Sequence, residues 1–284
     1  MKILLRPNLK KTDSLSCARE IIKRFCALAI TPMLDEAARP VLNDPTCVYG
    51  PEDALMADCD MVMPIGGDGT VMRTAKRATM LGKPIIGINT GRVGFLTQLE
   101  SAELENLALL KSGRYTICDR MLLEGVIHGE RQSGEAFVCL NDIVVARSEK
   151  AGIVDIQVSA GGRVITNQRG DGIIFATPTG STAYTLSAGG PVVDPGLELM
   201  VLTAICPHAT FRHSLVLPMD TVYTVQEQII NRRNGLTVTA DGRRVAVIGA
   251  DDSLVIQKHA APAKFVELDP HDFYASLSQK LSWH

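Results

Sequence analysis

Residues 59–81, CDMVMPIGGDGTVMRTAKRATML, hold the pattern that decides the fold of the amino-terminal part of this chain. The apolar run at 59–65 predicts a buried strand, GGDGT follows it at 66–70, and residues 70–81 predict a helix. KPIIGINT at 83–90 predicts another strand that ends in glycine-rich sequence. This order is typical of a doubly wound parallel sheet, in which ligands bind at the carboxyl ends of the strands.

The same alternation extends towards the amino terminus, where MKILLR predicts a strand and residues 14–30 predict a helix. After a predicted helix at 101–112, short β-rich runs dominate, and turn pairs such as Gly161-Gly162 and Asp241-Gly242 separate several of them. These runs predict an all-β domain of strands packed face to face.

The sequence therefore predicts an α/β, doubly wound amino-terminal domain and an all-β carboxyl-terminal domain. The α/β domain carries GGDGT and covers residues 1–98, and the β-rich domain covers 99–267. Residues 268–284 contain HDFYASLSQKLSWH, which predicts a helix that packs back on the first domain.

The composition is that of an ordinary globular protein. The 284 residues are enough for two domains, and the net charge of −2 gives no basic excess that would indicate nucleic-acid binding. No apolar run reaches the roughly 20 residues of a membrane span. The amino terminus becomes polar too soon for a signal peptide, so we expect a cytoplasmic protein without a membrane partner.

Seven cysteines are widely spaced and form no CxxC pair, which disfavours a disulfide framework or a zinc ribbon. We expect most of them to be buried apolar residues and none to be a catalytic nucleophile. His208 and His213 are not spaced like zinc ligands, and no residue is assigned as a metal ligand.

The GGDGT loop has the composition of a phosphate-binding loop, because glycine backbones can approach phosphate closely and the following helix presents its positive end. Asp68 lies among these glycines, where a carboxylate would repel phosphate unless it held Mg²⁺ or accepted a proton from a hydroxyl nucleophile. The alternative is a tight turn in which Asp68 only caps the helix. The chain has neither GxxxxGK[ST] nor GxGxxG.

A second glycine- and hydroxyl-rich stretch, DGIIFATPTGSTAYTLSAGG, spans residues 171–190. Each buried hydroxyl needs a hydrogen-bond partner, so this many favours contact with a polyhydroxylated, phosphorylated ligand. Its hydroxyl residues are Thr177, Thr179, Ser181, Thr182, Thr185 and Ser187. Together with GGDGT, this stretch predicts a site that holds a nucleotide and transfers a phosphate.

Four further residues are candidates for binding, and three of them also have a structural interpretation. Asn141 and Asp142 can read an amide-bearing ring and a ribose diol, or form an ordinary turn pair. Arg169 can meet a phosphate or a carboxylate. Tyr184 can stack on a base or pack in the core.

These motifs, in this order, resemble those of the NAD kinase family. The resemblance rests on GGDGT (66–70), GINTGRVGFL (87–96), LND (140–142), RGDGIIFATPTGSTAYTLSAGGPVV (169–193), ICPH (205–208) and the final FYASLSQKLSW. GGDGT alone is unspecific, since lipid kinases and phosphofructokinases carry similar loops, whereas GDG, TPTGSTAY and LSAGGP in one run are specific.

The resemblance implies transfer of a phosphoryl group to the 2′-hydroxyl of the adenosine ribose of NAD, which makes NADP. ATP would bring Mg²⁺ with it, and another triphosphate or polyphosphate remains an open alternative as donor. Family members are homodimers or homotetramers in which part of the NAD site comes from a neighbouring subunit.

Carried over by position, the resemblance makes Asp68 the proton acceptor, with Gly69 beside it and Arg73 as a basic residue of the loop. It places Phe95 near the adenine and Asn141 and Asp142 against the dinucleotide. The remaining implied binding residues are Arg169, Asp171, Thr179, Thr182, Ala183, Tyr184 and Ser187.

Two departures from the family pattern are an acid shorter by one methylene, Asp142 in place of the commoner Glu, and Ala176 where Ser usually precedes TPTG. Two other functions share some of these features: a kinase acting on a lipid or sugar, and a non-catalytic NAD(P)-binding sensor. LND and TPTGSTAY disfavour the first, and the retention of Asp68 disfavours the second.

Overall fold

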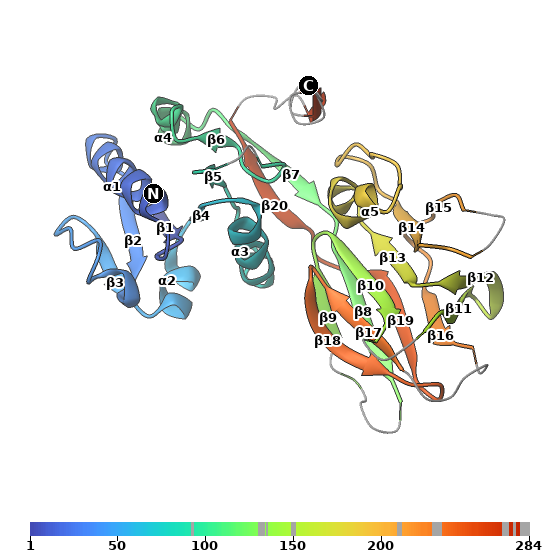
Figure 1. Ribbon diagram of the computed structural model, residues 1–284. Helices are drawn as coiled ribbons and strands as arrows, with labels where there is room; N and C mark the ends of the chain where they lie inside the picture. Colours follow the sequence, from blue (N-terminus) through green and yellow to red (C-terminus); the bar gives the residue numbers. More distant parts are fainter. Residues whose placement is uncertain are drawn as a thin grey trace. The chain divides into compact units, whose positions relative to one another are not determined.

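The computed structural model describes residues 1–91, 94–129, 134, 136–148, 152–208, 212–228, 235–268, 273–274 and 277–278 (Figure 1). The chain forms two compact units. The first comprises Met1–Asp119 and Ala263–His284, and the second comprises Arg120–Pro262.

The first unit contains a six-stranded sheet in the order β3-β2-β1-β4-β5-β6, with parallel pairing throughout. This is the doubly wound topology that the sequence predicts. The central strand β1 is buried on both faces, as its continuous apolar run indicates. The strands are β1 (Lys2–Pro7), β2 (Thr31–Asp35), β3 (Val48–Gly50), β4 (Met61–Ile65), β5 (Ile88–Asn89) and β6 (Leu99–Glu100).

Helices cover both faces of this sheet. α1 shares one apolar cluster with η2, α4 and alternate residues of β1 and β4, whereas α2 packs against β1 and α3 against β4. α1 ends earlier than the sequence predicts, because Ala29 has a φ of 52° and turns the chain into β2. The helices are α1 (Thr12–Ala27), η1 (Glu36–Ala38), α2 (Glu52–Asp58), α3 (Asp68–Met80), η2 (Leu104–Leu107) and α4 (Ala108–Lys111).

A two-stranded sheet of β7 (Thr116–Arg120) and β20 (Ala263–Glu267) also belongs to this unit. Ile85 donates its backbone N–H to Lys264 and accepts one from Val266, both at 2.8 Å. The boundary suggested by the sequence at residue 98 therefore lies inside the first unit. Most of the predicted helix in residues 271–284 lies outside the described residues, but the Phe273 ring lies 6.4 Å from the Phe95 ring.

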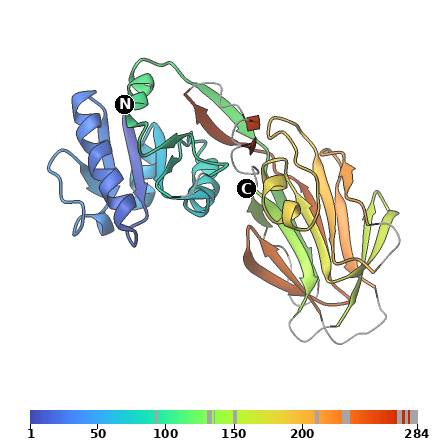
Figure 2. The ribbon, with the colours of Figure 1, turned by 45° about the horizontal axis from the view of Figure 1, so that its top comes forward.

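The second unit is a sandwich of two antiparallel six-stranded sheets, as predicted from its short alternating runs (Figure 2). One sheet has the order β15-β14-β13-β10-β17-β18 and the other β12-β11-β16-β19-β8-β9. Their inner faces share one apolar core, in which the rings of Phe175 and Tyr223 lie 5.8 Å apart. The predicted Gly161-Gly162 turn joins β11 to β12, with both glycines at positive φ.

The strands of the first sheet are β10 (Asp142–Arg147), β13 (Gly172–Ala176), β14 (Met200–Ile205), β15 (Leu215–Leu217), β17 (Leu236–Ala240) and β18 (Arg243–Ile248). Those of the second are β8 (Leu123–His128), β9 (Ala136–Cys139), β11 (Val154–Ala160), β12 (Arg163–Gly170), β16 (Tyr223–Glu227) and β19 (Ser253–Lys258).

The outer face of the β13 sheet is also buried. Val144, Ile174 and Val201 form a second cluster there, covered by Ala188 and Val193 from the segment after β13. That segment contains η3 (Thr179–Thr182) and α5 (Tyr184–Ser187). Burial on both faces explains why β13 is continuously apolar. The apolar side chains of Ala188 and Val193 hold the hydroxyl-rich stretch against this sheet.

Candidate active site

The GGDGT loop lies at the carboxyl end of β4 and turns into α3, whose first residue is Asp68. Gly66 has a φ of +155°, and a Cβ there would lie 2.8 Å from Thr70 Oγ1. The tight turn therefore requires glycine at this position and leaves the first N–H groups of a 13-residue helix without intrahelical partners. Such a helix start favours an anionic ligand.

The Asp68 carboxylate holds the neighbouring loop. Its Oδ2 accepts a hydrogen bond from Phe95 N at 3.0 Å and its Oδ1 accepts one from Leu96 N at 3.2 Å. A Cβ on Gly94 would lie 2.0 Å from Asp68 Oδ1, so only glycine allows this approach. The carboxylate is half-buried, and each oxygen has a second lone pair for another donor.

Arginine side chains surround the start of α3. Arg73 donates to Thr70 Oγ1 at 3.3 Å and is exposed beside Gly69. Arg6, at the end of β1, donates to Thr74 Oγ1 at 3.1 Å and pairs with Glu52 at 2.9 Å. Burial lowers the pKa of the Arg6 guanidinium, and the nearby Arg77 and Arg73 charges act in the same direction while Glu52 opposes them. This positive charge favours phosphate near the loop.

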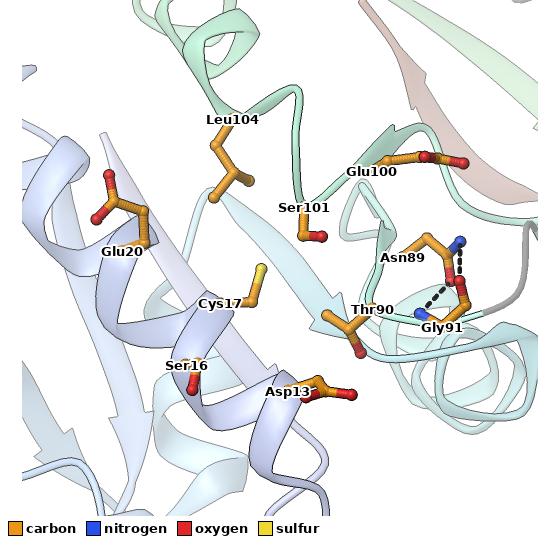
Figure 3. A pocket seen from close by; sticks show the side chains of 10 residues that line it. All are labelled: Asp13, Ser16, Cys17, Glu20, Asn89, Thr90, Gly91, Glu100, Ser101 and Leu104. Carbon is orange, nitrogen blue, oxygen red and sulfur yellow. Dashed lines mark hydrogen bonds between the residues drawn. The ribbon is translucent and has the colours of Figure 1, made fainter.

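A separate pocket of about 480 Å³ lies at the carboxyl ends of β5 and β6, beside α1 (Figure 3). Asn89 exchanges two hydrogen bonds with the backbone of Gly91 there, which fixes the turn after β5. Asp13, Glu20 and Glu100 make the lining acidic, so the lining does not favour direct contact with a phosphate. The sequence predicts ligand binding at the carboxyl end of the strand that ends at Asn89-Thr90, but it did not indicate the acidic lining.

Cys17 also lines the pocket, and burial raises the pKa of its thiol to about 11, which keeps it protonated and unreactive. The seven cysteines are all free. Only Cys17, Cys59 and Cys139 are fully buried, whereas Cys26 and Cys206 are exposed. The expectation that most cysteines are buried was therefore wrong.

In the second unit, Asn141 directly precedes β10 and Asp142 is its first residue, and hydrogen bonds hold the backbone here on two sides. The N–H groups of Leu140, Asn141 and Asp142 point at the carboxylate of Asp241, at 3.1, 2.8 and 3.4 Å. On the other side, Thr177 donates its N–H to Asn141 O at 2.9 Å and its hydroxyl to Leu140 O at 2.6 Å. The side chain of Asp142 is buried and that of Asn141 half-buried.

The hydroxyl groups of residues 177–187 divide into two sets. Those of Thr177 and Ser181 are buried and bonded to the loop backbone, where Ser181 Oγ donates to Pro178 O at 2.6 Å. Thr179 is also buried, whereas Thr182 is half-buried and Ser187 and Tyr184 are exposed. The hydroxyls of Thr177 and Ser181 thus build the loop, those of Thr182, Tyr184 and Ser187 remain at its surface, and Thr185 is buried.

The sequence that forms these sites can be compared with known proteins. The ATP-NAD kinase N-terminal domain matches residues 44–111, and the ATP-NAD kinase C-terminal domain matches residues 140–268. The NAD kinase of Symbiobacterium thermophilum is 36% identical over 282 residues, which is 99% of each chain. The chain belongs to the ATP-NAD kinase family. The NAD kinase of Wolinella succinogenes is 37% identical over 256 residues, 89% of this chain and 86% of that protein.

Solved structures of this family have the same fold. Yeast NADH kinase complexed with NADH has a TM-score of 0.88 at 21% identity and covers 100% of this chain and 88% of its own. The NAD kinase of Archaeoglobus fulgidus in complex with ATP has a TM-score of 0.72 at 27% identity, and the match covers 99% of this chain and 98% of that one.

The basic and acidic residues that the family resemblance pairs in RGD are separated in the structure. Asp171 pairs with Arg147 at 2.9 Å, whereas Arg169 lies 3.9 Å from Asp155. The residue between them must be glycine, because a Cβ on Gly170 would lie 2.8 Å from the carbonyl oxygens of Ile205 and Cys206. The ICPH segment therefore lies directly against this part of the family motif.

Sequence reasoning missed three residues around these clusters: Arg6, Arg147 and Asp241. Each is distant in sequence from the group that it contacts, so no local motif contains both. The Asp241-Gly242 turn was recognised only as a turn. Within the described residues, no three His, Cys, Asp or Glu side chains are grouped to hold a metal ion. Among those residues, no helix is long and apolar enough to cross a membrane.

Proposed function

We propose that this chain is an NAD kinase that transfers the γ-phosphoryl group of ATP to the 2′-hydroxyl of the adenosine ribose of NAD and so makes NADP. The observation that carries this proposal is the carboxylate of Asp68, which lies among the glycines of GGDGT at the start of α3 and is fixed by the backbone N–H groups of Phe95 and Leu96. Relatives with the same two domains over nearly the whole chain are named NAD kinase, which supports it.

Asp68 is the proton acceptor in this proposal. The 2′-oxygen forms a bond to the γ-phosphorus while the bond from that phosphorus to the β,γ-bridging oxygen breaks, and ADP leaves. The hydroxyl proton passes to a free lone pair of the Asp68 carboxylate. A base in hydrogen-bond reach typically contributes 10²–10⁴-fold to such a step.

The phosphates of ATP are assigned to the first unit. The backbone N–H groups at the start of α3 and the guanidinium of Arg73 provide donors for them, and Arg6 adds positive charge. Bound to ATP, Mg²⁺ would neutralise phosphate charge. Because no three His, Cys, Asp or Glu side chains are grouped among the described residues, we propose that it arrives with the triphosphate.

The dinucleotide is assigned mainly to the second unit. Asn141 and Asp142, set by the clamp around their backbone, and the surface formed by Thr182, Ala183, Tyr184 and Ser187 would contact it. Arg169, Asp171 and Thr179 complete the expected set, and Phe95 of the first unit is assigned to the adenine. Tyr184 is 45% exposed, which leaves its ring available for stacking.

The direct test is formation of NADP from NAD, ATP and Mg²⁺, measured with an NADP-specific dehydrogenase. Turnover supports the kinase. NAD binding without turnover, with ATP or polyphosphate, would support a sensor instead. Absence of NAD binding, with phosphorylation of another acceptor, would support a lipid or sugar kinase.

We also propose that the protein works in the cytoplasm as a homodimer or homotetramer. The free cysteines, two of them exposed, fit a reducing compartment. Val164 and Ile165 are exposed on β12, an edge strand, and fit burial against a second copy. Light scattering after gel filtration would give the number of subunits.

A further inference from the structure

The turn between β17 and β18 is a two-residue hairpin loop, Asp241-Gly242, with φ angles of 49° and 72°. Positive φ at both positions is the geometry that favours Asn-Gly or Asp-Gly, so the turn alone accounts for the residue types. It does not account for the direction of the Asp241 side chain, which reaches a different segment about a hundred residues away.

Asp241 extends the pairing between β10 and β17 beyond the last paired residues, first with its backbone N–H and then with its carboxylate. β10 pairs with β17 up to Ile143 and Ala240, and Asp241 then donates its backbone N–H to Asp142 O at 3.0 Å. Beyond that point its carboxylate accepts from three successive N–H groups, Oδ2 from Leu140 and Oδ1 from Asn141 and Asp142. Hydrogen bonds to an ionised carboxylate are stronger than neutral ones, so this side chain holds the whole turn.

The opposite side of the same turn is closed by Thr177 and Gly180. Thr177 bonds to the carbonyl oxygens of Leu140 and Asn141, and a Cβ on Gly180 would lie 2.0 Å from Asn141 O. The N–H groups of residues 140–142 are therefore held by Asp241, and the carbonyl oxygens of Leu140 and Asn141 are held by Thr177.

We propose that Asp241 is a positioning residue for NAD binding, which acts by orienting Asn141 and Asp142. This inference rests on the proposed function, in which that pair contacts the dinucleotide. The test variant is Asp241→Asn, because Asn-Gly suits the same turn and has the same size, while its amide presents N–H groups where one acceptor oxygen was.

The matched control is Asp252→Asn. Asp252 Oδ2 accepts the N–H of Gly249 at 2.8 Å in another turn of the second unit, so this variant also loses charge and an acceptor in a turn. We expect Asp241→Asn to raise the KM for NAD by on the order of tenfold, with the KM for ATP and the kcat much less affected. Asp252→Asn should leave all three parameters unchanged.

Hydrogen exchange gives a readout that does not depend on activity. The amides of residues 140–142 should exchange faster in Asp241→Asn than in the wild type, while amides in the core of the sandwich keep their protection. Unchanged exchange of these amides, or an unchanged KM for NAD, would overturn the positioning role.

Asn141→Ala separates failure of this inference from failure of the proposed function. If Asn141→Ala raises the KM for NAD and Asp241→Asn adds little to it in the double variant, Asp241 acts through Asn141. If the two effects simply add, the positioning role is wrong although the kinase assignment stands. If Asn141→Ala leaves NAD binding unchanged, Asn141 does not contact NAD and the positioning role through it fails, whereas the kinase assignment is decided by NADP formation in the wild type.

Discussion

The carboxylate of Asp68 accepts the backbone N–H of Phe95 at 3.0 Å, across 27 positions of sequence. The residue assigned as proton acceptor therefore also fixes the loop that carries the aromatic ring assigned to the adenine. Catalytic and structural roles at this position must be separated by experiment, and the amide analogue allows this because it keeps the size of the side chain.

Asp68→Asn should reduce NADP formation by roughly 10²–10⁴-fold, since the amide cannot accept the hydroxyl proton. It retains one acceptor oxygen, so one of the two backbone hydrogen bonds survives and we expect only a small fall in Tm. The measurements are kcat, NAD affinity by calorimetry, and Tm. Asp60→Asn is the control, because Asp60 accepts the N–H of Lys2 at 2.7 Å. Turnover within tenfold of wild type would remove Asp68 from the reaction.

Gly94→Ala should displace the Asp68 carboxylate, since its Cβ would lie 2.0 Å from Oδ1. We expect a loss of unfolding free energy of about 1–3 kcal/mol together with a large fall in kcat. Gly91→Ala is the matched control in the same segment, because nothing lies within 4 Å of a Cβ there. Denaturant unfolding and steady-state rates measure both effects, and a Gly94→Ala enzyme with normal kcat would contradict the proposed role of this contact.

Arg73→Ala should weaken use of ATP, because it removes an exposed guanidinium beside the start of α3. The expected result is a KM for ATP raised by about tenfold or more and an almost unchanged Tm. Arg24→Ala serves as control: Arg24 is on the last turn of α1 and pairs with Glu20 at 3.0 Å. Equal effects of the two substitutions on the KM for ATP would argue against a phosphate contact at Arg73.

Glu227 should make stability depend on pH. Burial raises the pKa of its carboxyl above the ordinary value, so in the pH range between these two values the folded protein binds more protons than the unfolded chain. The contribution of this group to the free energy of unfolding therefore falls as pH rises through that range, and it remains lower above it.

Glu227→Gln removes this titration. Relative to wild type, the variant should gain stability as pH rises from about 4 to 8, and the difference between the two should shrink at the acid end. Urea unfolding at several pH values measures it. Glu198→Gln, at an exposed carboxylate paired with Lys258, is the control. A difference between Glu227→Gln and wild type that is constant with pH would show that Glu227 does not titrate in this way.

Much of the fold was readable from local pattern. The apolar run at 59–65 became β4, GGDGT opened α3 at Asp68, and the glycine pairs became hairpin turns. The predicted helix at 101–112 appears as the short, consecutive η2 and α4, which bury Leu104, Leu107 and Leu110 in the core of the first unit.

By itself, the sequence determined the family, the two kinds of sheet and the residue types at the candidate site, because periodicity and glycine motifs act over a few neighbouring residues. Only the tertiary structure decided which distant groups meet: Asp68 with Phe95 and Asp241 with Asn141. The partner of a carboxylate depends on which backbone N–H groups remain unpaired once strands and helices have formed. That depends on packing between segments far apart in the chain, and no local pattern contains it.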